Sequence, residues 1–248
     1  MIWQDTQGEP QIGAISGTLY RLVESQEQVA TLGYVDTLEE QALLEEMLEG
    51  VKPPYPEQSD KLHYLLKTPF RYPPLEWGSR FGKAHEPSLF YGGGSVPTTL
   101  AESAYYRFVF WYSMEGERAK PTIRSEHTLF AVDYRTQRGV RLQQAPFDQF
   151  QAQLTHPSDY GSTQTLGSAM REAELEAFEY SSARDPGKGH CVALFTPKPF
   201  RQKRPKETNQ WLCEMSATEV SFKQLAVNEI NHFPLELFLF EGELTMPA

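Results

Sequence analysis

The sequence predicts an α+β fold with a largely antiparallel sheet in a single domain. Strand-like and helix-like segments are mixed along the 248 residues without the regular βαβ alternation that builds a parallel sheet. Hydrophobic residues make up 40% of the chain and aromatic residues 12%, which is too rich for a disordered protein. No interior linker interrupts the pattern, so we expect one domain over residues 1–248.

The first half of the chain alternates ordered elements with a long proline-rich stretch. Residues 19–23 read as a strand. Residues 36–50 form an amphipathic helix pattern, in which Asp36 is the expected N-cap and Gly50 the stop. Residues 51–87 contain repeated prolines, which remove backbone donors and restrict the preceding residue. We therefore expect a long loop there, and loops of that length are usually functional.

The second half alternates short strands and helices. A strand at 88–91 runs into the glycines 92–94, which are expected to make a tight turn or a close backbone approach. A helix follows at 98–114, because its apolar residues recur at helical spacing. Further helices are expected at 147–154 and 165–176, and further strands at 128–133, 178–182, 191–195, 211–215 and 236–240.

Charge and cysteine usage exclude several classes of protein. The net charge of −10 disfavours direct nucleic-acid binding, and one short basic cluster is interpreted as a solvated loop: Arg201, Lys203, Arg204 and Lys206. Two cysteines and no C-x-x-C favour a reducing compartment. The N-terminus has no secretory signal pattern, and no stretch is apolar enough for a membrane span. The expected location is the cytoplasm, with no membrane partner.

Most familiar site motifs are absent. The sequence contains no P-loop, no dinucleotide-binding fingerprint and no nucleophile elbow. No two of its six histidines stand at metal-ligand spacing, so we expect no metal. Cys191 lies in an apolar run and is interpreted as a core residue.

Several polar residues stand where predicted strands and helices meet, and each also has a purely structural interpretation. Arg80 fits a surface ion pair, and Tyr91 fits a half-buried strand aromatic. Glu102 fits the third position of a capping box that begins at Thr99. Ser182 and Arg184 fit the start of a turn. Taken singly, none of these residues indicates a function.

Taken together and in order, these segments resemble the RES domain family. The motifs are Gly-Ser-Arg80-Phe-Gly, Leu-Phe-Tyr91, Thr-Thr-Leu-Ala-Glu102 and Tyr-Ser-Ser182-Ala-Arg184. Arg80 and Tyr91 are eleven residues apart, as are Tyr91 and Glu102. The resemblance runs from about residue 19 to residue 195. It implies an ADP-ribosyltransferase-like fold with a split, mostly antiparallel sheet and flanking helices, and NAD as a substrate rather than a bound cofactor.

The residue chemistry suits that substrate. Arginine binds a pyrophosphate in bidentate fashion, which is the role expected of Arg80. Cleaving the nicotinamide–ribose bond builds positive charge on the ribose, which the Glu102 carboxylate would stabilise. Tyr91 would stack on nicotinamide or contact a phosphate, and Ser182 would contact the carboxamide or a phosphate. In a phosphorylase the acceptor phosphate would need a further cationic group besides the one on the pyrophosphate, and three arginines are candidates: Arg21, Arg71 and Arg184.

The resemblance implies a bacterial toxin that depletes NAD by hydrolysis or phosphorolysis and is neutralised by an Xre-family antitoxin. Two alternatives stay open: transfer of ADP-ribose to a cellular protein, and an inactive binding module of a toxin–antitoxin complex. Compared with compact family members, the chain has an insertion at about 36–87 and an extension after about 200. We expect the loop 51–87 to lie at the rim of the nucleotide groove.

Overall fold

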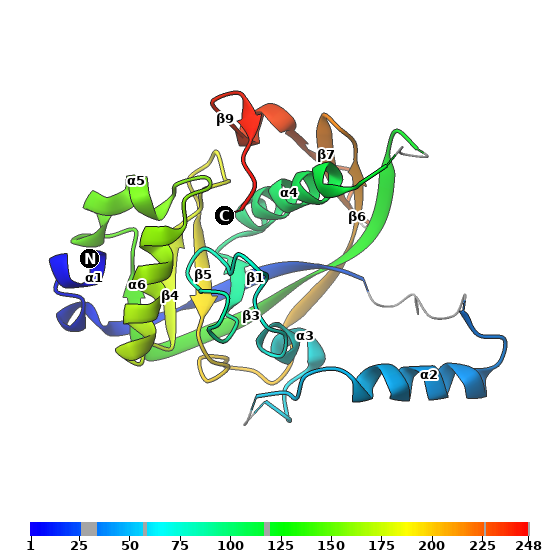
Figure 1. The fold of residues 1–248 in the computed structure, drawn as a ribbon, viewed down its shortest axis with the longest axis horizontal. Coiled ribbons are helices and arrows are strands. Elements are labelled where there is room, and N and C mark those ends of the chain that lie inside the picture. The colour runs from blue at the N-terminus through cyan, green and yellow to red at the C-terminus, as the bar shows by residue number, and fades with distance from the viewer. Residues whose placement is uncertain (26–33, 57–58, 117–119, 226, 248) are drawn as a thin grey trace.

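A computed structural model describes residues 1–25, 34–56, 59–116, 120–225 and 227–247. Its main feature is an eight-stranded sheet in the order β1-β2-β5-β4-β3-β6-β7-β8 (Figure 1). The strands are β1 (Gly13–Glu24), β2 (Phe90–Gly93), β3 (Ile123–Arg141), β4 (Ala177–Ser181), β5 (His190–Leu194), β6 (Glu207–Met215), β7 (Glu219–Gln224) and β8 (Ile230–Pro234). β3 and β4 pair in parallel, whereas the remaining pairs of described strands are antiparallel. The predicted α+β class is confirmed.

The long strand β3 connects two parts of the sheet. Its first half pairs with β6, its last residues pair with β4, and β1 pairs with its residues 127–139. β1 also pairs with β2 through Tyr20 and Gly93. Strands β1, β2, β5, β4 and β3 therefore close into a ring, and β6, β7 and β8 extend the sheet beyond it. The sequence predicted only the apolar centre of this strand, at 128–133.

Helices cover the sheet in separate groups, each over its own apolar cluster. Near one end lie α1 (Ile2–Asp5), α5 (Gln151–Leu154) and α6 (Gly161–Glu172). The helix α4 (Val96–Ser113) packs over β6 and β7. Beside β1 lie α3 (Tyr64–Lys67) and the 3-10 helix η3 (Thr68–Phe70). Figure 1 shows α2 (Leu38–Gly50) extending away from the rest of the chain.

Two helix starts differ from the prediction, and both differences concern capping. Thr37, not Asp36, is the N-cap of α2, and it forms a complete capping box with Glu40. Helix α4 begins at Val96 with Ser95 as its N-cap, whose hydroxyl accepts from the Thr98 N–H. Thr99 therefore lies inside the first turn. The capping-box interpretation of Glu102 is wrong, and its carboxylate is available for another role.

Other predictions hold with shifted ends. The loop 51–87 is mostly irregular, with α3 and η3 as short helical turns. The helix expected at 165–176 lies earlier, as α6, and the one at 147–154 forms as η4 (Phe147–Phe150) followed by α5. The strand expected at 236–240 is wrong for most of its length. A 3-10 helix η5 (Leu235–Phe238) occupies it, followed by the two-residue strand β9 (Leu239–Phe240), which pairs with β10 (Glu243–Leu244).

The strands β7 and β8 were not predicted. Both strands are short, and only Val220 and Phe222 of β7 are fully buried, so the alternating strand signal spans few residues. Within the described residues, no helix combines the length and the apolar character needed to cross a lipid bilayer.

Candidate functional site

A cleft of about 610 Å³ lies between the first turns of α4, the ends of β1 and β2, and the proline-rich loop. Its walls include Arg21, Arg80, Tyr91, Glu102 and Arg184. Five of the seven predicted site residues therefore come together, although up to 163 positions separate them in the sequence. Loop residues form part of the rim, which confirms the expected place of the loop 51–87: Pro69, Tyr72, Pro73, Pro74, Leu75 and Trp77.

Arg80 is held in a tight turn by neutral groups. Gly78 has a left-handed φ of 78°, a conformation that favours glycine, and Ser79 and Gly82 pair across the turn. The Arg80 side chain is only 9% exposed. Its Nη1 donates to the His156 carbonyl at 2.8 Å, and its guanidinium lies 4.5 Å from the centre of the Tyr160 ring. The ion-pair interpretation of Arg80 is wrong, because no described carboxylate neutralises this cation.

Tyr91 holds the turn that carries Arg80. Its hydroxyl accepts from the Phe81 N–H at 3.2 Å and shares a 2.9 Å hydrogen bond with the Ser79 hydroxyl. Burial raises the pKa of Tyr91 to about 12, so the phenol stays protonated and able to bond. Its contacts lie on both sides of Arg80 in the sequence, and this indicates a positioning role for the hydroxyl.

Glu102 lies one turn into α4 and is oriented by Ser182. The Ser182 hydroxyl donates to Glu102 Oε1 at 2.5 Å and accepts from the N–H groups of Arg184 and Asp185 at 3.1 and 2.9 Å. A serine hydroxyl has one proton and two lone pairs, so these contacts use its full capacity. Ser182 therefore serves both as a turn residue and as a support for Glu102, rather than as an open contact in the cleft.

Arg184 and Arg21 are two further cations of the cleft. Arg184 is 5% exposed, and its guanidinium lies 3.5 Å from the centre of the Tyr105 ring and bonds to the Pro157 carbonyl. Strand β4 ends at Ser181, so Arg184 comes from the turn and not from a strand face shared with Ser182. Arg21 Nη1 donates to the Tyr91 carbonyl at 2.6 Å, while its Nε is buried without a hydrogen-bond partner. Burial lowers the pKa of Arg21 to about 10.

Arg71 is not brought into the cleft. Its Nη1 lies 2.6 Å from Glu49 Oε1, its Nε donates to the Pro53 carbonyl, and its guanidinium stacks on Tyr55 at 4.1 Å. These contacts join the end of α2 to the loop. In the described structure the expected substrate contact of Arg71 is therefore replaced by a structural one.

Some cleft residues were missed in the sequence. Tyr160 lies under Arg80, Tyr105 lies under Arg184, and Trp77 is 42% exposed at the rim. Aromatic faces attract guanidinium groups, but the pairs are remote in sequence, so no local pattern could reveal them. Cys191 is buried near Glu102 and its pKa is raised by burial, in agreement with a core role.

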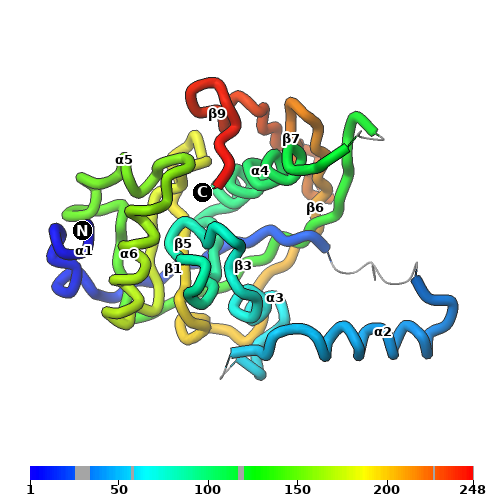
Figure 2. The backbone as a smooth tube through the Cα atoms, in the orientation of Figure 1, coloured from blue at the N-terminus to red at the C-terminus, as the bar shows by residue number. Residues whose placement is uncertain are grey.

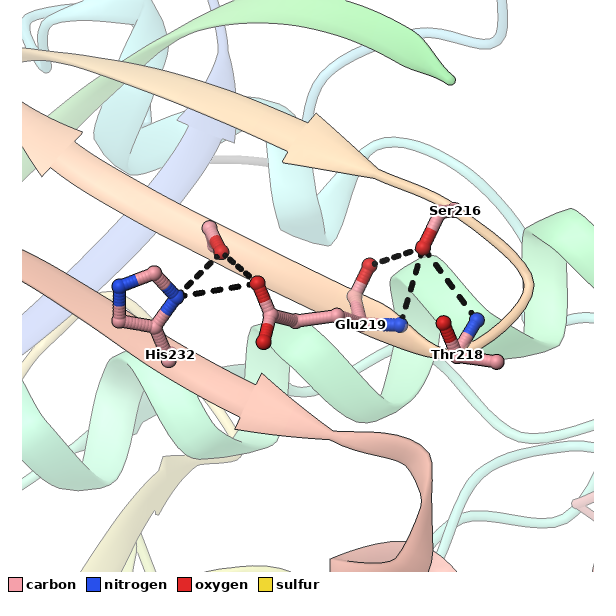
Figure 3. A network of polar contacts seen from close by, with 5 residues as sticks. Ser216, Thr218, Glu219 and His232 are labelled. Carbon is pink, nitrogen blue, oxygen red and sulfur yellow. Dashed lines mark hydrogen bonds and ion pairs between the residues drawn. The ribbon is translucent and has the colours of Figure 1, made fainter. Parts of the chain in front are cut away.

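A second polar cluster, on the outer strands of the sheet, contains Glu219, Ser221 and His232 (Figure 3). Its composition matches a catalytic triad, but its geometry does not. Glu219 Oε1 and the Ser221 hydroxyl both lie 3.0 Å from the same ring nitrogen, Nδ1, whereas a triad places the acid and the nucleophile on opposite ring nitrogens. The cluster is exposed and joins β7 to β8. Among the described residues, no group of three or more His, Cys, Asp or Glu side chains is arranged to hold a metal ion.

Comparison with known proteins identifies the family. Residues 56–216 match the RES domain, which covers more than half of the chain. No curated protein matches the sequence. Among solved structures, the crystal structure of the M. tuberculosis MbcT–MbcA toxin–antitoxin complex is similar at 12% sequence identity and a TM-score of 0.46, over 87% of this chain and 92% of that one.

Proposed function

The chain belongs to the RES domain family, and we propose that it is the toxin of a toxin–antitoxin pair and cleaves the nicotinamide–ribose bond of NAD. The observation that carries the proposal is the charge arrangement of the cleft. Arg21, Arg80 and Arg184 line it beside Glu102, while the fourth lining arginine, Arg107, pairs with the other lining carboxylate, Glu24, at 3.4 Å. Each of the first three guanidinium groups is held by carbonyls or aromatic rings, and none of them forms an ion pair with a described carboxylate.

Buried cations without counter-ions favour an anionic ligand. Removing a charge from water is costly unless a charge or several hydrogen bonds replace the solvent. Backbone carbonyls partly satisfy these guanidinium groups, and the single Glu102 carboxylate stands against all three of their positive charges. A pyrophosphate supplies two negative charges and accepts bidentate hydrogen bonds from arginine. The cleft volume of about 610 Å³ is also within the range of sites for molecules of this size.

Glu102 is suited to the ribose end of the substrate. As the nicotinamide–ribose bond breaks, its electron pair leaves with nicotinamide, which departs as a neutral molecule, and positive charge develops on the ribose carbon. A carboxylate fixed in advance stabilises that charge without reorganising during the reaction. The hydrogen bond from Ser182 fixes the Glu102 carboxylate in this way. Water or phosphate then forms the new bond to the ribose carbon, and the acceptor's proton is released to solvent.

The test is to incubate the pure protein with NAD at increasing phosphate concentration and to identify the products by mass. Nicotinamide with ADP-ribose indicates hydrolysis, and nicotinamide with the 1″-phosphate of ADP-ribose indicates phosphorolysis. Labelled ADP-ribose on a co-incubated protein, with neither small product, would replace this proposal by the transferase alternative. If NAD stays intact, the inactive binding module is the better description.

Replacing one arginine in the cleft and one on the outer sheet provides a matched comparison. We expect Arg80→Met to reduce turnover by about 10²-fold, because the pyrophosphate contact that positions NAD for cleavage is lost. Arg124→Met is the control, since Arg124 is exposed and paired with Glu214 at 2.6 Å on the outer sheet. Equal activity of the two variants would exclude Arg80 from the substrate site.

The same cleft is the proposed target of the antitoxin, which we expect to be an Xre-family protein. A partner segment inserted into the groove around Arg80 and Tyr91, beside the proline-rich part of the loop 51–87, would block NAD from the cations of the cleft. Binding of ADP-ribose to the isolated chain and to the complex, measured by calorimetry, tests this. Unchanged affinity in the complex would show that inhibition does not act through the cleft.

A further inference from the structure

The chain beyond the family match returns to the cleft. The match ends at residue 216, and the remaining residues form β7, β8, η5 and the β9–β10 hairpin before reaching Pro247, which lines the cleft. Figure 2 shows this last segment in red, running back toward the centre of the molecule. The residues it touches are the ones that hold two of the cleft arginines.

The first contact is with Tyr105. This residue is fully buried on α4, one turn after Glu102. Its hydroxyl donates to the Thr245 carbonyl at 2.6 Å, and its ring packs near Phe238. On its face lies the Arg184 guanidinium, 3.5 Å from the ring centre. The C-terminal segment therefore fixes the aromatic surface on which Arg184 rests.

The second contact is with His156. The ring of Phe240 in β9 packs edge-on against the His156 ring, with 5.8 Å between the centres. The His156 carbonyl accepts the 2.8 Å hydrogen bond from Arg80, and the following residues Pro157 and Tyr160 contact Arg184. Residues 156–160 thus hold both Arg80 and Arg184, and Phe240 of the C-terminal segment packs against the first of these residues, His156.

We propose that residues 235–247 are part of the binding site of this chain: they position Arg184 through Tyr105 and Arg80 through His156, so that both can bind a phosphate-bearing ligand. This inference rests on the proposed function for the identity of the ligand. The physical reason is that a guanidinium held only by neutral groups keeps its position only if those groups keep theirs. An ion pair would hold it through a longer-range attraction. Fixing the ring and the carbonyl in the free protein removes ordering that binding would otherwise require.

The test uses two tyrosines of α4, each bonded to a carbonyl of the C-terminal region. Tyr105→Phe removes the bond to Thr245 and keeps the ring under Arg184. Tyr112→Phe removes the 2.9 Å bond to the Ala217 carbonyl, which lies outside the cleft, and is the matched control. The probe is ADP-ribose, which carries the pyrophosphate and lacks the scissile bond, and its Kd is measured by calorimetry on the full chain.

We expect Tyr105→Phe to raise the Kd of ADP-ribose by about three- to tenfold, the size expected for one lost hydrogen bond, and Tyr112→Phe to leave it unchanged. In turnover assays with NAD, KM should rise in the same proportion and kcat should change less than twofold. Phe240→Ala should act in the same direction, and its effect should vanish when Arg80 is already replaced by Met. Each tyrosine variant loses one hydroxyl-to-carbonyl bond, but Tyr105 is buried and Tyr112 is 45% exposed. Melting temperatures of both variants are therefore compared before a shift in Kd is assigned to positioning.

Three results would overturn the inference in distinguishable ways. If the unaltered chain binds ADP-ribose and Tyr105→Phe binds it equally well, the segment is structural and the proposed function stands. If the unaltered chain binds neither ADP-ribose nor NAD, the proposed function and this inference fail together. Equal loss of affinity in Tyr105→Phe and Tyr112→Phe would indicate a general effect of the C-terminal fold, and it too would overturn positioning.

Discussion

The cleft and the outer edge of the sheet use the same pair of residues in opposite ways. In the cleft, Ser182 donates to Glu102 at 2.5 Å, and on β7, Ser221 donates to Glu219 at 2.9 Å. Ser182 is buried and arginines line the surrounding walls, whereas Glu219 is exposed and its neighbour is His232. A serine–glutamate pair therefore does not by itself indicate a ligand-binding or catalytic site. Burial and the neighbouring charges decide whether it can act on a ligand.

The largest expected difference between the two pairs concerns catalysis. Glu102→Gln keeps the shape of the side chain and removes its charge, so it should lower NAD turnover by at least ~10²-fold, as for loss of a group that stabilises the transition state. Glu219→Gln makes the same change on the outer sheet and should leave turnover within twofold. Initial rates of nicotinamide release from both variants provide the measurement. Equal rates would remove Glu102 from the proposed chemistry.

The histidine that lies at the cleft should couple the stability of the protein to pH. Burial lowers the pKa of His127, which is 2% exposed and lies at the cleft, to about 4. His127 therefore binds a proton at about pH 6.5 in the unfolded chain but only at about pH 4 in the folded chain. This histidine should lower the free energy of unfolding by about 2 kcal/mol between pH 7 and pH 5.

Denaturant titrations at several pH values measure that dependence. His127→Gln can still bond to Ser125, the present partner of the ring at 2.9 Å, and should flatten the curve between pH 7 and pH 5. A curve that keeps its slope in His127→Gln would assign the pH dependence to other groups.

A smaller difference is expected for the two serines. Ser182→Ala frees the Glu102 carboxylate to rotate and should reduce kcat by about tenfold, the value of one charge-assisted hydrogen bond. Ser221→Ala leaves Glu219 in contact with His232 and should not affect turnover. Because Ser182 also accepts two backbone N–H groups, melting temperatures of both variants are needed. A loss of activity that follows only the loss of folded protein would contradict the positioning role.

The smallest effect is expected for the outer pair itself. Hydrogen bonds from His232 and Ser221 lower the pKa of Glu219. The stabilisation that these hydrogen bonds give to the folded protein is therefore present above the unfolded pKa of about 4.3. It is lost as the pH falls through the lower pKa of Glu219 in the folded protein. Exposed pairs contribute about 0–1 kcal/mol, so Glu219→Gln should change the free energy of unfolding at pH 7 only slightly. A large loss would mean that β7 and β8 depend on this pair more than their exposure indicates.

Local patterns predicted the elements that depend on neighbouring residues. The helix α4 was recognised because its buried positions recur every three or four residues, and β4 and β5 were recognised from short apolar runs. Cap positions were less predictable. Asp36 and Thr37 are both good N-cap residues, and only the backbone shows that Thr37 bonds to Glu40.

The site could be predicted in part from the sequence, because its residues belong to short motifs in a recognisable order. Arg80, Tyr91 and Glu102 were selected in this way, and all three line the cleft. Arg71 was selected with them because arginine suits phosphate, yet it pairs with Glu49. Residue type alone could not separate it from Arg184, which lies in the cleft.

The sequence by itself determined the α+β class, the central helices and strands, and the identities of the charged residues that the cleft uses. Only the tertiary structure decided which arginines lack a carboxylate partner, that Ser182 supports Glu102, and that the chain after residue 216 returns to hold Tyr105. The reason is physical. Secondary structure depends on contacts within a few residues. The charge state and orientation of a site depend on burial and on partners 80 to 140 positions away, which the closed ring of β1, β2, β5, β4 and β3 brings together.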